Sequence, residues 1–508
     1  MQVARDLATD PSIAWAEPNS YQQGGSLPND PMFGEQWALQ NTGQSVNGEA
    51  GTAGDDIDAT AAWERSTGSH SVLVSVVDSG INFDSPDLAP NIAPGGWDFV
   101  QNDADPSDAY GHGTHVAGII GARGDDGLGV SGVDWNASIL PVRVLNNLNT
   151  GTCATVAAGL SYAAEAGARV VNVSIYSYVH CQAEEEAIAA APDTLFVAIA
   201  GNDGLSTNSS PTFPCTDPEP NIICVAATDQ DDRLASFSNY GPGVDLAAPG
   251  TNIESTFLRW GPTETLYEDG FETSLSGRWT TSGSWDRTIQ NPLHGVFSLT
   301  DSPFANYSND DYTYAQRSLD LIGHKDCAVV VHADTALGSG DYLLGEIQPD
   351  GIDDTEPALT GTSAGYEKQY FDLAPLEGRS DGAFRFSLLS DELGVSDGAY
   401  LDDFSVQCVP VLRSYTGAPS EYEIDYGTSM AAPYVTGTAA LVLSVDQALS
   451  ATEVKQRILD SAYLLPSLAG KVESGGRLDA GRAVGLAPAP APTPTGAPTP
   501  KGTSPASA

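Results

Sequence analysis

The feature that most constrains the fold of this chain is a series of short, continuous apolar runs that alternate with alanine-rich segments. The runs lie at residues 72–77, 138–144, 170–175, 195–200 and 222–227, and the segments with helical character lie at 115–122, 155–166 and 184–191. Strands that are apolar along their whole length are typical of a parallel sheet buried on both faces, with helices in the crossovers. The pattern predicts an α/β fold with a doubly wound, mostly parallel sheet of several strands.

A second pattern interrupts the first between about residues 262 and 413. Aromatic residues, Thr, Ser, Gly and Asp dominate there, in short alternating stretches such as 327–333 and 382–389. Such a segment predicts an inserted all-β sandwich. Apolar helical signals return at 429–445 and 452–462, so we expect the α/β domain to resume after the insertion.

We therefore expect five segments along the chain. They are an N-terminal segment and linker at 1–30, the first part of the α/β domain at 31–261, the sandwich at 262–413, the second part of the α/β domain at 414–486, and a Pro-rich linker or tail at 487–508. The tail has the composition of an extended polyproline-type chain, which builds no core. Because the chain opens within what looks like the end of a domain, we expect it to be a fragment of a longer precursor.

The charge balance excludes two classes of partner. The 508 residues include 67 acidic and 21 basic side chains, a formal net charge of −46. Nucleic-acid phosphates and anionic lipid surfaces repel such a chain, so neither is an expected partner. No apolar run approaches the roughly 20 residues of a membrane span, and no signal peptide opens the chain. A hydrated acidic surface suits work outside the cell, at high or variable salt.

The six cysteines point to disulfides. No two of them form a CxxC pair, so the sequence does not support a zinc ribbon or a thioredoxin-type motif. Six cysteines allow 15 connectivities. Proximity in the sequence and in the expected domains favours three pairs, with buried free thiols as the alternative. The pairs are Cys153 with Cys181, Cys215 with Cys224, and Cys327 with Cys408.

Three short segments carry reactive side chains at the junctions of expected elements. Asp78 ends an apolar strand, His112 enters a helix between glycines, and Ser429 begins an apolar helix. A hydroxyl is a poor nucleophile unless a base lies within hydrogen-bond reach, and an imidazole base needs a buried carboxylate to orient it. The three residues supply these roles in the order Asp, His, Ser.

The segments 76–80, 111–118 and 427–433, together with 200–204, resemble in sequence and order the motifs of the subtilisin-like serine proteases, the subtilase family. The resemblance covers about residues 37–259 and 414–486. It implies that the chain is a serine endopeptidase with an Asp-His-Ser triad, which requires no cofactor for catalysis.

The resemblance also gives Asn202 a role. A carboxamide at a strand end, joined by the backbone N–H of Ser429, stabilises the oxyanion of the tetrahedral intermediate. The alternative is that Asn202 only forms a turn with Gly201 and Gly204.

Two other patterns in the sequence suggest different chemistry. His112 and His115 lie three residues apart and could in principle share a metal, but the nearby sequence has no matching cluster of ligands. The resemblance assigns the base to His112, and His115 is expected to pack behind it.

Ser363 lies in a Gly-x-Ser-x-Gly segment, which is a motif of another class of hydrolases. That motif requires a histidine after the serine, and all seven histidines precede Ser363.

The resemblance places the substrate-binding edges at Gly151-Thr152-Cys153 and Ser174-Ile175-Tyr176. An extended peptide pairs with such edges through its main chain. Tyr176 departs from the family, in which a glycine is common at this position, so the width of the cleft is in question. A Cys153–Cys181 disulfide would tie the two edges together.

Residues 10–19 resemble the end of a subtilase propeptide, and 29–37 resemble the start of a mature enzyme, which implies self-cleavage between them. A flexible N-terminal arm is the alternative.

The insertion is similar to sandwich modules of secreted bacterial hydrolases, and it is expected to act either as a spacer or as a binding module. Acid-rich loops such as 102–108 suit structural Ca²⁺, without a ligand set that the sequence identifies.

The sequence thus predicts a secreted subtilisin-like serine endopeptidase, made as a zymogen, whose partners are protein or peptide substrates and its own propeptide. The alternative is a catalytically silent adhesion or carrier protein that uses the same fold and the sandwich for binding.

Overall fold

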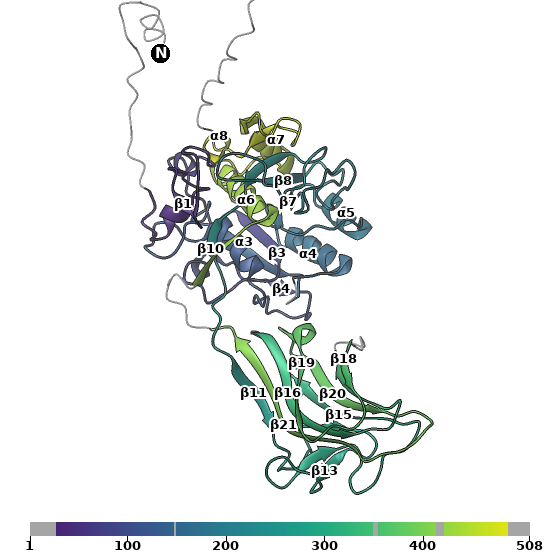
Figure 1. The fold of residues 1–508 in the computed structure, drawn as a ribbon. Helices are drawn as coiled ribbons and strands as arrows, with labels where there is room; N and C mark the ends of the chain where they lie inside the picture. Colours follow the sequence, from purple (N-terminus) through teal and green to yellow (C-terminus); the bar gives the residue numbers. More distant parts are fainter. Residues whose placement is uncertain (1–26, 147–148, 349–353, 413–420, 486–508) are drawn as a thin grey trace, which may run out of the picture.

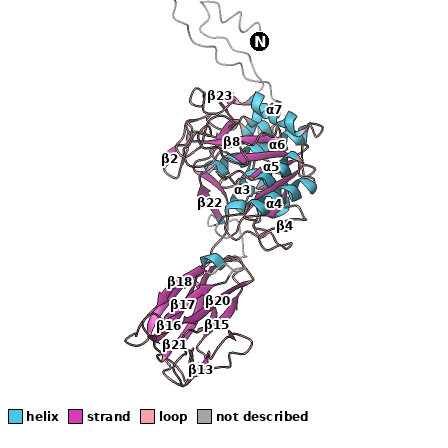
Figure 2. Ribbon diagram, turned by 90° about the vertical axis from the view of Figure 1, so that its right-hand side faces the viewer, coloured by secondary structure: helices cyan, strands magenta, loops and turns pink. Residues whose placement is uncertain are grey.

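The computed structural model describes residues 27–146, 149–348, 354–412 and 421–485, which form two bodies (Figure 1). One body surrounds a central sheet with helices, and the other consists almost entirely of strands (Figure 2). The predicted α/β fold interrupted by a β-sandwich is confirmed. The expected N-terminal segment up to residue 26 and the Pro-rich tail lie outside the described residues.

A nine-stranded sheet forms the centre of the α/β body. Its strands are β3 (Leu73–Asp78), β4 (Trp97–Asp98), β5 (Ser138–Arg143), β6 (Val170–Val173), β7 (Leu195–Ile199), β8 (Ile222–Thr228), β9 (Leu246–Pro249), β23 (Tyr463–Leu464) and β24 (Gly476–Arg477). They are ordered β23-β24-β9-β8-β7-β6-β3-β5-β4, and only the β23–β24 pair is antiparallel. Every residue of β7 and β8 is buried, which explains the continuous apolar runs in the sequence.

Helices cover both faces of this sheet. On one face, α3 (His112–Gly121) and α6 (Thr428–Val445) share an apolar core with Val74 and Val76 of β3. On the other face, α4 (Cys153–Glu165) and α5 (Gln182–Ala189) share a core with Val77. The remaining helices are α2 (Ala59–Trp63), α7 (Ala451–Ser461), α8 (Ala480–Ala483), and the single-turn η1 (Phe33–Glu35), η2 (Ala89–Asn91) and η3 (Ala374–Leu376).

Helix α6 runs through the middle of the α/β body. Among the described helices it is the one that is long and apolar enough to cross a membrane by length and composition. However, 89% of the residues in that stretch are buried inside the protein. Its composition is therefore that of a core helix, and its second residue is Ser429.

The sandwich consists of two antiparallel sheets. Its strands are β11 (Glu264–Asp269), β12 (Thr280–Thr281), β13 (Asp286–Thr288), β14 (Ser298–Thr300), β15 (Tyr312–Leu319), β16 (His324–Ala336), β17 (Tyr342–Ile347), β18 (Asp354–Leu359), β19 (Glu367–Asp372), β20 (Gly382–Leu389) and β21 (Gly398–Pro410). One sheet is ordered β13-β14-β21-β16-β19, with β11 also on β21, and the other β12-β15-β20-β17-β18. Trp279, Phe386 and Phe404 pack between the two sheets.

The chain enters and leaves the sandwich along neighbouring antiparallel segments. In the α/β body, β10 (Ile253–Thr256) pairs with β22 (Tyr422–Asp425). Trp260 then bridges to Val411, and β11 pairs with β21 inside the sandwich. A small hairpin, β1 (Ser45–Val46) with β2 (Glu49–Ala50), completes the described strands.

All six cysteines are paired in disulfides. Cys153 bonds to Cys181, Cys215 to Cys224, and Cys327 to Cys408, with Cα–Cα distances of 5.9, 5.0 and 4.1 Å. These are the three pairs that the sequence favoured. The last pair lies inside the sandwich core, whereas the first links the starts of α4 and α5.

Candidate active site

Asp78 and His112 meet where β3 ends and α3 begins. The Nδ1 atom of His112 lies 2.7 Å from Oδ1 of Asp78, and Asp78 is fully buried. Two glycines allow this approach: a Cβ on Gly113 would lie 2.2 Å from the carbonyl oxygen of Gly80, and Gly80 itself has φ +109°. The Gly-His-Gly pattern therefore seats the start of α3 directly on the end of β3.

The charge of Asp78 sets the state of His112. Burial disfavours the imidazolium, but the Asp78 carboxylate and its hydrogen bond outweigh that effect, so the pKa of His112 is raised above its ordinary value. Asp78 also accepts a hydrogen bond of 2.7 Å from the backbone N–H of Ser79. The pair therefore supplies an oriented imidazole next to a fixed negative charge.

Asp108 holds the first turn of α3 in place. Its Oδ1 accepts from Ser79 Oγ and from the backbone N–H groups of Tyr110 and Gly111, each at 2.9 Å. Its Oδ2 accepts from the N–H and the hydroxyl of Thr114 at 3.0 and 2.5 Å. This carboxylate belongs to the acid-rich loop for which Ca²⁺ was suggested, and these bonds occupy both of its oxygens.

Ser429 approaches the same place from α6. Its hydroxyl donates a hydrogen bond to the backbone carbonyl of Ser174 at 3.4 Å. Within the described residues it makes no hydrogen bond to His112. Ser429 and His112 line one cavity of about 300 Å³. Hydrogen bonds between catalytic groups are often long or misaligned without substrate.

Asn202 lies beside the start of α6. Its Oδ1 accepts from the N–H and the hydroxyl of Thr428, both at 2.8 Å, so its Nδ2 faces the cavity that it lines. A Cβ on Gly427 would lie 3.4 Å from Asn202 Nδ2 and 3.6 Å from the backbone nitrogen of Ser429. Any side chain at position 427 would therefore fill the space between these two donors.

The expected substrate-binding residues fall into two groups. Ser174, Ile175 and Tyr176 line the cavity with His112 and Ser429, whereas Gly151 and Thr152 are not among its lining residues. Thr152 caps α4, where its hydroxyl accepts from the N–H of Thr155 at 3.1 Å. On that side of the cavity, Leu145 and Asn149 provide the lining.

Asp203 holds the ring of Tyr176 in place. The hydroxyls of Tyr176 and Tyr178 both donate to Asp203 Oδ2, at 2.8 and 2.6 Å, and the two rings meet edge to face. A Cβ on Gly201 would lie 3.1 Å from the Tyr176 ring. The ring is thus fixed over the turn that carries Asn202.

His115 lies behind the site. Its Nε2 is 3.1 Å from the carbonyl oxygen of Ile253 and 3.0 Å from that of Glu423, so this nitrogen carries the proton that both oxygens accept. Burial lowers the pKa of His115 below its ordinary value. His115 therefore ties α3 to the β10–β22 pair as a neutral side chain.

Some lining residues were not expected from the sequence. They are Tyr110, Leu145, Asn149, Ile199, Asp425 and Tyr426. Asp425 and Tyr426 directly precede the motif that holds Ser429, and Tyr110 directly precedes Gly111 and His112, so proximity to the motifs was the available signal. Leu145, Asn149 and Ile199 lie at or beyond strand ends, and only the sheet order brings them to the cavity.

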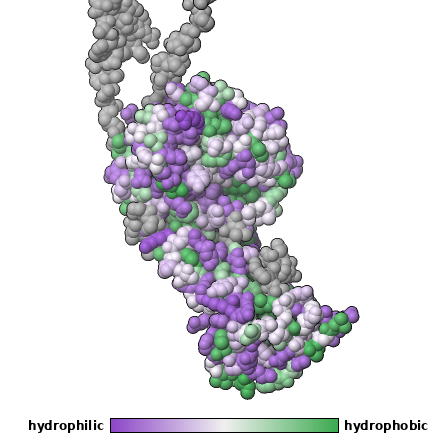
Figure 3. All heavy atoms as spheres, viewed as in Figure 1, coloured by the Kyte–Doolittle hydropathy of each residue, from purple (hydrophilic) through white to green (hydrophobic). Residues whose placement is uncertain are grey.

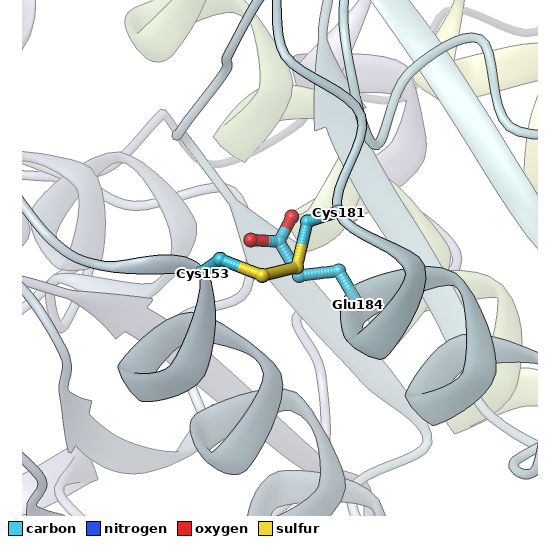
Figure 4. A group of neighbouring side chains, drawn as sticks. All are labelled: Cys153, Cys181 and Glu184. Carbon is cyan, nitrogen blue, oxygen red and sulfur yellow. A yellow bond between two sulfur atoms is a disulfide. The ribbon is translucent and has the colours of Figure 1, made fainter.

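Among the described residues, two groups of side chains have the composition of a metal site. Cys153, Cys181 and Glu184 lie together in Figure 4, but the two sulfurs form a disulfide and are not free to bind a metal. His180 Nε2 lies 2.8 Å from Glu185 Oε2 and 3.5 Å from Asp217 Oδ1. A charged imidazole there forms ion pairs with both carboxylates. Neither group includes the loop 102–108, so structural calcium stays an expectation.

Comparison with known proteins places the chain among characterised relatives. The model of the subtilase family matches residues 69–286 and 411–487, on both sides of most of the sandwich. Thermitase of Thermoactinomyces vulgaris is 41% identical over 253 residues, 49% of this chain and 79% of thermitase. A thermophilic serine proteinase of Bacillus sp. strain AK1 is 38% identical over 257 residues, 50% of this chain but only 59% of that protein.

A solved structure supports the fold. A protease from Pseudoalteromonas arctica PAMC 21717 aligns with a TM-score of 0.50 and 22% identity, over 90% of this chain and 99% of the other. At that identity the similarity concerns the fold alone.

Proposed function

The chain belongs to the subtilase family, and from this premise we propose that it is a secreted serine endopeptidase with Asp78, His112 and Ser429 as its catalytic triad. The observation that carries the proposal is the 2.7 Å contact between His112 Nδ1 and the buried Asp78 carboxylate, at a cavity that Ser429 also lines. A carboxylate in that place keeps the proton of a neutral imidazole on Nδ1, which leaves Nε2 as the base.

In the proposed reaction, the Ser429 hydroxyl turns from Ser174 toward His112. His112 takes the hydroxyl proton as Oγ bonds to the carbonyl carbon of the peptide, and it gives the proton to the leaving amine as the C–N bond breaks. Water then attacks the acyl carbon while His112 takes its proton; the ester C–Oγ bond breaks, and His112 returns the proton to Ser429 Oγ. These steps require no cofactor.

Asn202 Nδ2 and the backbone N–H of Ser429 are the proposed donors to the oxyanion. Thr428 fixes the carboxamide by its oxygen, so the donor is aimed before the reaction begins. Preorganised donors of this kind act without reorganisation cost, which makes them effective in the transition state.

Protein or peptide substrates, and the chain's own N-terminal segment, are the proposed partners. An extended peptide would lie along the strand end that carries Ser174, Ile175 and Tyr176, with Gly151 and Thr152 on the opposite edge. Self-cleavage is proposed between residues 19 and 29. Sequencing the N-terminus of the purified protein and of its Ser429→Ala variant tests this step, because only the active chain should be shortened there.

Secretion is supported by two properties of the chain. Three disulfides suit an oxidising compartment, where such bonds persist. The formal net charge of −46 suits a protein that remains hydrated outside the cell; hydrophilic side chains cover much of the face in Figure 3.

Covalent labelling separates the enzyme from a silent adhesion or carrier protein with the same fold. A fluorophosphonate probe should label the parent chain at Ser429, and Ser429→Ala should abolish the label while circular dichroism shows retained folding. A processed, folded parent that takes up no label would contradict the proposal and favour the silent carrier.

A further inference from the structure

A second cavity, of about 480 Å³, adjoins the candidate active site at the junction of the two bodies. Its walls come from the α/β body and from the sandwich. They are Ala109, Tyr110, His112, Phe257, Trp260, Lys325, Asp326, Glu377, Glu423 and Asp425. Tyr110, His112 and Asp425 also line the first cavity, so the two spaces meet around the catalytic histidine.

The sandwich is attached closely enough to serve as a wall. Besides the paired segments that lead into it, Lys325 lies over the ring of Trp260 with its Nζ 4.1 Å from the ring centroid. The side chain of Gln101 in the α/β body donates to the backbone carbonyl of Gly378 in the sandwich. Lys325 belongs to β16 and Gly378 follows η3, so the sandwich contacts the α/β body at two separate places.

The walls of this junction cavity are acidic and aromatic. Among the described lining residues, four carboxylates, Asp326, Glu377, Glu423 and Asp425, accompany Lys325, which lies against Trp260, and the imidazole of His112. Burial and the neighbouring Asp425 raise the pKa of Glu423, while Lys325 acts in the opposite direction. Tyr110, Phe257 and Trp260 add apolar and π surface, along which the carbon stem of a long cationic side chain packs favourably.

The position of His112 tells which part of a substrate reaches this cavity. The proposed oxyanion donors and the strand end at Ser174 lie on the first cavity, where the residue that bears the attacked carbonyl must lie. The amine that leaves takes its proton from His112. The space on the other side of His112 therefore receives residues after the cleaved bond.

We propose that the junction cavity is a binding subsite for a lysine or arginine side chain one or two residues after the cleaved bond, with the inserted sandwich as its outer wall. This inference rests on the proposed endopeptidase function. It gives the insertion a role in substrate selection, in addition to any role as a spacer.

The test compares quenched fluorescent peptides that differ only in the first or second residue after the cleaved bond, as Lys, Ala or Glu. The parent enzyme should cleave the Lys peptides with the highest kcat/KM at one of the two positions, and the Glu peptides with the lowest. Added NaCl should reduce the difference, because salt screens partly exposed charges.

Asp326→Asn removes one wall charge from the sandwich. The backbone there has φ +48°, which asparagine tolerates. We expect the Lys-to-Ala ratio of kcat/KM to fall roughly threefold to tenfold, the range for losing about 1 kcal/mol of interaction. Asp310→Asn is the matched control, since Asp310 is exposed, has φ +54° and lies outside the cavity; its ratio should equal that of the parent.

The outcomes separate this inference from the proposed function. A parent that labels with fluorophosphonate and cleaves Lys, Ala and Glu peptides equally at both positions would overturn the subsite and leave the endopeptidase standing. The same holds if Asp326→Asn and Asp310→Asn change the ratio alike. A parent that does not label would overturn both.

Discussion

The Asn202 side chain accepts two hydrogen bonds of 2.8 Å from Thr428, one from its backbone N–H and one from its hydroxyl. An amide whose oxygen is held in this way presents its NH₂ group on the opposite side, and that side faces the cavity with Ser429. The residue just before the proposed nucleophile thus orients the proposed oxyanion donor.

Replacing Asn202 by alanine should lower kcat by about 10²–10³, the usual cost of one oxyanion donor, with little change in KM. Thr428→Val leaves the backbone N–H bond and should have a smaller effect. Steady-state kinetics on one peptide measures both. An unchanged kcat in Asn202→Ala would show that this carboxamide is not a catalytic donor.

The activity should fall as the pH drops through the pKa of His112, because only the neutral imidazole accepts the serine proton. That pKa is raised by the Asp78 charge against the opposing effect of burial. In Asp78→Asn the acidic limb should therefore move to lower pH, and kcat should fall by about 10⁴ through loss of the correct tautomer. The pH profiles of kcat/KM for the two proteins measure this. A limb at the same pH in both would contradict the assigned cause.

Tyr176→Gly should widen the first cavity and raise kcat/KM for peptides with a large residue before the cleaved bond, relative to peptides with alanine there. The physical reason is that the ring lines the cavity and is fixed by Asp203. Tyr176→Phe keeps the ring and loses only the hydroxyl, so it should retain the parent preference. A library profile that is the same for Tyr176→Gly and the parent would remove Tyr176 from the specificity determinants.

Asp134 should make the protein less stable as the pH rises. It is fully buried, and burial raises its pKa to about 8. Since the folded state holds the proton more tightly than the unfolded chain, the stability is greatest below the ordinary aspartate pKa of about 4 and is lost as the pH rises through about 8.

Asp134→Asn removes this titration. In a Ser429→Ala background, which prevents self-digestion, the unfolding midpoint of Asp134→Asn relative to its background should rise by several degrees or more between pH 5 and pH 9. Each pH unit between the two pKa values corresponds to about 1.4 kcal/mol, and ~1 kcal/mol corresponds to about 2–4 °C. The exposed Asp310→Asn is the control. If both variants show the same pH dependence as the background, Asp134 is not the titrating group.

The local sequence determined much of this protein. Continuous apolar runs identify β7 and β8 as buried strands because a sheet covered on both faces admits no polar face. The glycines around His112 and before Ser429 mark where backbone must approach backbone, so the motifs alone indicate Asp78, His112, Ser429 and Asn202 as the candidate site.

Only the tertiary structure decided what surrounds that site. Asp326 and Glu377 lie in the insertion, and they reach the neighbourhood of His112 because β10 and β22 pair and lead the chain out and back at that point. Tertiary contacts also decide which carboxylates border the cavities. Both oxygens of Asp108 accept hydrogen bonds from the start of α3, whereas Asp425 lines both cavities. Local sequence patterns specify which residues are buried and where small residues let the backbone pack closely. The cavity between the two bodies depends on how segments far apart in the chain pack together, and no local pattern specifies that.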